Sequence, residues 1–134
     1  ESVEQRGSNI TAERLRFDFS FDRALTEAEK SQVQQFINDW IAADLRVDKQ
    51  TLPKQEALQS GAIALFVEKY PDTVNVYSIG QNPNGAQKGK DFISREFCSG
   101  PHVQRTSEIG EIELTREKAV ADGIRRIYAL QKSA

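Results

Sequence analysis

The sequence predicts an α+β fold in which a mainly antiparallel sheet packs against one long amphipathic helix and a shorter helix. Strand-like segments are numerous, one long stretch has helical periodicity, and strands and helices do not alternate as they do around a parallel sheet. The 134 residues, 38% of them hydrophobic and 28% charged, are typical of a globular protein with its own core. We therefore expect residues 1–134 to form a single domain.

The first predicted strand is the segment 14–22, which alternates strictly between apolar and polar residues. This period of two is typical of a half-buried strand. Its apolar positions are Leu15, Phe17, Phe19 and Phe21. Thr26 and Glu29 then form a T-x-x-E capping box, in which each side chain satisfies a backbone donor at the start of a helix.

Behind the capping box, apolar residues recur at helical spacing and predict one long amphipathic helix that ends near residue 45. These residues are Val33, Phe36, Ile37, Trp40, Ile41 and Leu45. Phe36 and Trp40 could serve as a base-stacking platform. Because they lie on the apolar stripe, we expect them in the core instead.

The rest of the chain has mainly strand patterns. A short strand is expected at 46–51, a minor helix at 53–59, and further strands at 73–79, 92–97, 109–115 and 124–130. The stretch GQNPNGAQKGKD at 80–91 has the composition of a loop. It is not a phosphate loop, since Ala86 and Gln87 stand where that motif has Lys and Ser or Thr.

The composition limits the cellular setting. A net charge of −2 argues against an indiscriminate grip on nucleic acid, although it allows a local basic patch. No apolar run is long enough to span a bilayer and no secretory signal opens the chain, so we expect no membrane partner. The single cysteine favours the reducing cytoplasm. The chain has no methionine and begins at Glu1, so we expect an excised piece of a longer protein; removal of a tag or of the initiator is the alternative.

The only cysteine and the only histidine, Cys98 and His102, stand four residues apart in SREFCSGPHVQRTSEIG, residues 94–110. A thiolate and an imidazole on one turn of backbone can bind one metal ion, and zinc takes such ligands in sets of four. One alternative is an unreactive buried thiol beside a histidine that is hydrogen-bonded to the backbone. Another is a Cys–His nucleophilic dyad, for which the sequence offers no orienting third group.

Several segments resemble, in order and spacing, the editing (second additional) domain of alanyl- and threonyl-tRNA synthetases and their free-standing trans-editing relatives. They are VEQRGS at 3–8, ERLRFDFS at 13–20, ALFVEKY at 64–70, SREFCSGPHV at 94–103, TSEIG at 106–110 and GIRRI at 123–127. RFDFS and GIRRI favour the alanyl type. Pro101 departs from it, because C-x-G-P-H is the form of the threonyl branch.

The resemblance implies a hydrolase that edits mischarged aminoacyl-tRNA, with seryl and secondarily glycyl esters on alanine tRNA as substrates. It implies zinc held by Cys98 and His102 together with an H-x-x-x-H helix upstream, so that this fragment holds two of four ligands and is inactive or nearly so. Zinc would polarise the ester carbonyl, deliver water, or orient the substrate. Gln5 matches a polar residue of the editing pocket and is the catalytic candidate.

The resemblance also implies tRNA as a partner and the remainder of a synthetase chain as a neighbour. The candidate tRNA-binding residues are Lys88, Lys90, Arg125 and Arg126. Arg125 and Arg126 are adjacent on a predicted strand and should point to opposite faces, one pairing with a carboxylate and the other reaching a phosphate. Asp18 is expected to be solvated or salt-bridged, and Glu108 to cap or pair near the turn.

Two other functions stay open at this level. A non-catalytic module could recognise the acceptor end of tRNA or dock a partner protein, which would suit an incomplete ligand set. A threonyl-type editing domain would differ only in the tRNA that it serves.

Overall fold

The computed structural model describes residues 3–64, 69–80 and 93–132, so Lys88 and Lys90 lie outside the described residues. It has two antiparallel sheets and two helices, which confirms the predicted α+β class. The chain folds as two compact units: a first unit of Glu1–Ala42 with Ile109–Ala134, and a second unit of Ala43–Glu108. Within the described ranges, none of the helices has both the length and the apolar character that crossing a bilayer requires.

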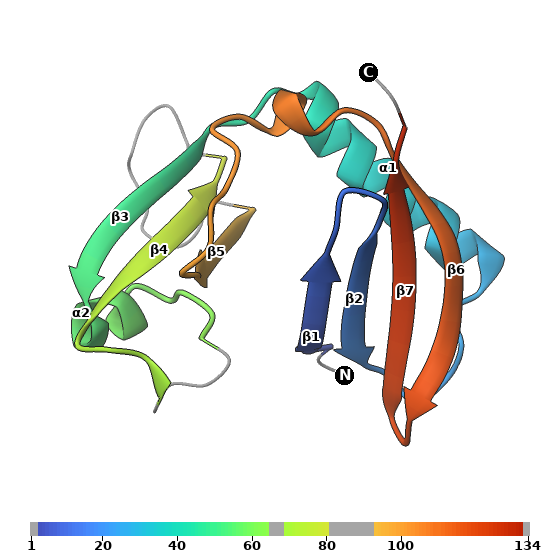
Figure 1. Cartoon of the computed structure of the whole chain (residues 1–134), viewed down its shortest axis with the longest axis horizontal. Coiled ribbons are helices and arrows are strands. Elements are labelled where there is room, and N and C mark those ends of the chain that lie inside the picture. The colour runs from blue at the N-terminus through green and yellow to red at the C-terminus, as the bar shows by residue number, and fades with distance from the viewer. Residues whose placement is uncertain (1–2, 65–68, 81–92, 133–134) are drawn as a thin grey trace. The chain divides into compact units, whose positions relative to one another are not determined.

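The first unit contains a four-stranded sheet of order β1-β2-β7-β6 and one helix (Figure 1). The elements are β1 Gln5–Ile10, β2 Leu15–Ser20, α1 Glu27–Ala42, β6 Ile112–Ala121 and β7 Ile124–Gln131. The apolar face predicted for β2 is confirmed at Phe19, which is buried together with Ile127 and Ala129 of β7. The sequence analysis predicted no strand at 5–10, where the structure has β1.

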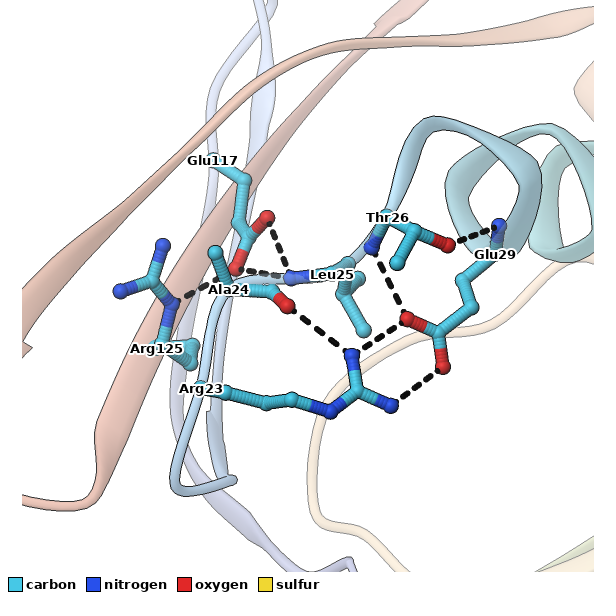
Figure 2. Close-up of polar contacts among 7 residues, drawn as sticks. All are labelled: Arg23, Ala24, Leu25, Thr26, Glu29, Glu117 and Arg125. Atoms are coloured by element: carbon cyan, nitrogen blue, oxygen red, sulfur yellow. Dashed lines mark hydrogen bonds and ion pairs between the residues drawn. The ribbon is translucent and has the colours of Figure 1, made fainter.

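The predicted capping box at the start of α1 is confirmed (Figure 2). The backbone N–H of Glu29 donates to Thr26 Oγ1 over 3.1 Å, and the backbone N–H of Thr26 donates to Glu29 Oε1 over 2.8 Å. Arg23 donates to both carboxylate oxygens of Glu29, over 2.7 and 2.9 Å. The hydrogen bond from Arg23, followed by the one from the Thr26 backbone, lowers the pKa of Glu29 to about 2.

A second carboxylate fixes the chain just before this helix (Figure 2). Both oxygens of Glu117 on β6 accept the backbone N–H of Leu25 over 3.1 Å, and Oε2 also accepts Arg125 Nε over 2.6 Å. The Glu117 side chain is only 3% exposed and that of Arg125 is 16% exposed. The entry to α1 is therefore tied to β6 and β7 by a buried charged network.

The expectation that Phe36 and Trp40 lie in the core is wrong. Their exposed fractions are 49% and 41%, and their rings stack on one another with centroids 5.9 Å apart. Ile41 is the buried residue of α1. The apolar stripe of the helix is thus only partly used for packing within the described residues of the first unit.

The physical reason is a polar contact between α1 and the edge of β6. Asn38 accepts the backbone N–H of Ile112 over 2.8 Å and donates to its carbonyl over 2.9 Å. Gln34, one turn earlier, accepts the backbone N–H of Leu114 over 2.9 Å. Two amides four residues apart on a helix are about 6 Å apart along its axis, which nearly matches two residues of a strand. The helix therefore presents Gln34 and Asn38 to the sheet edge. Phe36 and Trp40, on another side of the helix, consequently stay exposed.

The second unit contains a three-stranded sheet of order β3-β4-β5 and the short helix α2. The elements are β3 Val47–Pro53, α2 Lys54–Gln59, β4 Thr73–Ile79 and β5 Ser94–Phe97. The predicted strands and minor helix are confirmed here with small shifts at their ends. The core of this unit consists of Ala57, Ala62, Val74, Val76 and Phe97.

Candidate functional site

Cys98 follows directly after β5 and is tied to β4 by its backbone. Its N–H donates to the carbonyl of Asn75 over 3.1 Å, which continues the β4–β5 pairing by one residue. The thiol is free and half-buried. A Cβ placed on Gly100 would lie 3.9 Å from Cys98 Sγ, an ordinary van der Waals contact, so the middle of the turn passes close to the sulfur without crowding it.

His102 is positioned by Tyr77, a residue of β4 that the sequence analysis did not single out. The imidazole stacks on the Tyr77 ring with centroids 3.8 Å apart and planes inclined by 22°. The Tyr77 hydroxyl donates to the carbonyl of Gly100 over 3.0 Å. One tyrosine therefore holds both the middle and the end of the C-x-x-x-H turn. An aromatic residue near the middle of an alternating strand was the available signal, but the pattern alone does not say what it contacts.

The protonation state of His102 suits metal binding. Desolvation lowers the pKa of His102, because one side of the ring is covered and the charged form loses water, while the nearby Glu96 carboxylate opposes this change. A lowered pKa means that the imidazole is neutral at neutral pH. Neutral imidazole is the form that coordinates metal.

The described residues fit two positions of a zinc shell. Thiolate sulfur and imidazole nitrogen are ligands that zinc prefers, and structural and catalytic sites use three or four protein ligands. In 3–64, 69–80 and 93–132 there is no group of three or more His, Cys, Asp or Glu residues that could hold an ion. Cys98 and His102 would therefore be joined by ligands from elsewhere in a complete site.

The other candidates are distributed over both units. Gln5 is half-buried at the start of β1 in the first unit, opposite Phe19 and beside a bulge in the β1–β2 pairing, whereas Cys98 and His102 belong to the second unit. Glu108 accepts the backbone N–H groups of Gln104 and Arg105 over 2.9 and 2.6 Å. This confirms its predicted capping role.

Arg125 and Arg126 lie on opposite faces of β7, as expected from their adjacency. Their register partners on β2 are Phe19 and Asp18 respectively. Both guanidinium groups are paired: Arg125 with Glu117, and Arg126 with Asp18 through Nε over 2.8 Å and a second nitrogen over 3.0 Å. Of the two roles expected for Asp18, solvated or salt-bridged, the structure shows the salt bridge. The hydrogen bond from Arg126 lowers the pKa of Asp18, against the opposing effect of burial.

Comparison with known proteins finds one matching family model and several similar alanine–tRNA ligases. The family model of the threonyl and alanyl tRNA synthetase second additional domain matches residues 74–128. An alanine–tRNA ligase of Treponema pallidum is 50% identical over 132 residues, which cover 98% of this chain and 20% of that protein. The corresponding ligase of Treponema denticola is 48% identical over 130 residues, covering 97% and 20%.

The alanine–tRNA ligase of Paracoccus denitrificans is 46% identical over 135 residues, covering 100% of this chain and 15% of that protein. The chain therefore spans a fifth or less of the length of these relatives. All three of these relatives are alanine–tRNA ligases. The chain belongs to the second additional domain family of threonyl and alanyl tRNA synthetases, and it is of the alanyl type.

Proposed function

We propose that this chain is the editing hydrolase module of an alanyl-tRNA synthetase or of a free-standing relative. It would cleave the ester of serine, and secondarily of glycine, wrongly attached to alanine tRNA in the cytoplasm. The observation that supports this proposal is the 98–102 turn, in which the free Cys98 is tied to β4 through its backbone N–H and the His102 imidazole stacks on Tyr77 of β4. This turn stands inside a chain that aligns with alanine–tRNA ligases over nearly its whole length.

In this proposal Cys98 and His102 are two of four zinc ligands, and an H-x-x-x-H helix of the parent protein supplies the others. The 134-residue chain by itself is then inactive or nearly so. Bound zinc supplies Lewis-acid polarisation of the ester, an activated water, or a fixed point for the ribose or the substrate amine. Tyr77 is a positioning residue, because it holds the imidazole and the Gly100 carbonyl without providing a ligand.

Gln5 is the proposed contact to the misattached amino acid. Its side-chain amide can both donate and accept a hydrogen bond, which matches the hydroxyl of serine. A pocket that hydrogen-bonds this hydroxyl leaves its own polar group unpaired when alanine enters. Such a site therefore acts as a second sieve that removes serine and spares the correct product.

The test uses the full-length synthetase that contains this chain. Bound zinc and the rate of seryl-tRNA deacylation are measured for the natural protein, for Cys98→Ala, and for Ser99→Ala as a control on the same turn. The proposal expects Cys98→Ala to lose zinc and deacylation together, while Ser99→Ala keeps both. Full deacylation and full zinc content in Cys98→Ala would refute the assignment. The 134-residue chain alone, assayed beside them, checks the expected inactivity of the fragment.

A second candidate is a non-catalytic module that recognises the acceptor end of tRNA or docks a partner protein. The observation in its favour is the incomplete ligand group among the described residues, together with Pro101 inside the turn. It predicts that the full-length protein binds acceptor-stem RNA equally well with Cys98→Ala or with a chelator, and shows no deacylation in either state.

A further inference from the structure

The face of the first-unit sheet that carries Asp18 and Arg126 has a concentration of positive charge. Register places side chains across the strands in two adjacent rows. One row runs from Arg16 on β2 through Tyr128 on β7 to Arg116 on β6, and the next from Asp18 through Arg126 to Lys118. We name these six residues the cationic face. The opposite face carries Phe19, Ile127 and Glu117, which contacts the entry to α1.

Most of this charge is not neutralised within the described part of the chain. The Arg126 guanidinium is neutralised by the Asp18 carboxylate, to which it donates two hydrogen bonds. Arg16, Arg116 and Lys118 form no ion pair with a carboxylate of the described residues. Three cations therefore remain in excess on one sheet face of a chain whose overall charge is −2. Such a local excess attracts an anionic partner, although the chain as a whole does not.

The contacts around Tyr128 show how closely these cations are gathered. Arg116 Cζ lies 4.5 Å from the centroid of the Tyr128 ring, and Lys118 Nζ lies 5.9 Å from it. The pKa of Tyr128 is lowered, first by a hydrogen bond from Arg116, and also by Arg126 and Lys118. The ring thus acts as a platform that holds two long basic side chains beside one another on β6.

Arg16 adds an unsatisfied donor to the same face. Its Nε is buried and has no hydrogen-bond partner among the described residues. A buried donor without an acceptor costs free energy. Guanidinium groups prefer flat or tetrahedral oxyanions, which they bind with several parallel hydrogen bonds.

We infer that the cationic face binds the phosphodiester backbone of the tRNA, through Arg16, Arg116 and Lys118. This inference rests on the proposed function, because tRNA is the polyanion that an editing module handles. We favour a phosphate over a nucleic-acid base as the bound group. The Tyr128 ring, on which a base could stack, already has Arg116 and Lys118 over it. Contacts of this kind position the RNA and carry no sequence information. Arg125 has no part in them, because it lies on the other face with Glu117.

The test measures tRNA affinity of the full-length synthetase in a potassium chloride series. The variant is Arg116→Ala/Lys118→Ala, and the matched control is Arg46→Ala/Lys49→Ala, an exposed Arg and Lys of the second unit. Each lost phosphate contact reduces the salt slope of the affinity by about 0.9. Between 50 and 200 mM salt, the natural protein should therefore lose about tenfold more affinity than the variant. The control should keep the natural slope.

The charge-preserving variant Arg116→Lys/Lys118→Arg separates lost charge from lost structure, since it should restore most of the slope. Deacylation kinetics form a second readout, in which the alanine variant raises KM more than it changes kcat. An unchanged salt slope in a folded alanine variant would overturn the inference even if seryl-tRNA is deacylated normally. Absence of deacylation in the natural protein would instead refute the proposed function, while the salt slope would still report on this face.

Discussion

Replacing Glu117 should destabilise the first unit more than any surface substitution, because two groups, the Arg125 guanidinium and the Leu25 N–H, depend on its carboxylate. Glu117→Ala leaves the Arg125 guanidinium and the Leu25 N–H without their partner, at a site where the two side chains are 3% and 16% exposed. Removing one member of a buried ion pair costs about 3–5 kcal/mol. The cost arises mainly from the charge left behind, not from the attraction that is lost.

Unfolding in urea measures this loss directly. Trp40 is the only tryptophan and belongs to α1, so its fluorescence reports on the first unit. With a urea dependence of about 1–3 kcal/mol per molar, the midpoint for Glu117→Ala should fall by roughly 2 M. Replacing both partners, as in Glu117→Leu/Arg125→Met, should recover much of the loss, because no charge stays buried.

Two results would refute this reasoning. One is a midpoint shift for Glu117→Ala no larger than that of an exposed control such as Glu111→Ala. The other is a double variant that is as unstable as the sum of its single variants, which would mean that Glu117 acts through packing and not through charge.

Three further predictions follow from individual contacts. Arg23→Ala should raise the pKa of Glu29 from about 2 toward its ordinary range, as read from the carboxyl carbon by NMR. Since the folded-state pKa is depressed, the stability that this carboxylate contributes is present above pH 4.5 and is lost as pH falls toward 2. Asn38→Ala should cost about 1–3 kcal/mol in urea unfolding, because part-buried backbone groups of β6 lose their partner; a cost below about 0.5 kcal/mol would contradict this. Tyr77→Ala should raise the pKa of His102 toward 6.5 in an NMR titration, and an unchanged value would show that the stack does not cause the desolvation.

The sequence was informative wherever short-range physics decides the structure. The alternation at 14–22 predicted β2, and the T-x-x-E pair predicted the start of α1, because both depend on residues within a few positions of each other. The strands at 73–79 and 124–130 were found for the same reason. QRGSNI, by contrast, has no alternation, and β1 forms because β2 offers it an edge to pair with.

The sequence identified the candidate pair of the site but not the residue that positions it. Cys98 and His102 stand out because each is the only residue of its type. Nothing in the spacing indicates that Tyr77, 25 positions before His102, holds the imidazole. The exposure of Phe36 and Trp40 was equally hidden, since the helical pattern identifies an apolar stripe and not the surface against which it packs.

By itself the sequence determined the kinds of element, the capping of α1 and the family, and it singled out Cys98 and His102 as candidates. Only the tertiary structure decided which charges meet. Arg126 pairs with Asp18, 108 positions away, because the β2–β7 register places the two residues side by side. Glu117 on β6 accepts the backbone N–H of Leu25, 92 positions away, in a long-range contact that no local preference sets. The same register separates Arg125 from Arg126 and gathers Arg16, Arg116 and Lys118 on one face. Long-range pairing sets which cations are neutralised and which stay available to a partner, and no local pattern records it.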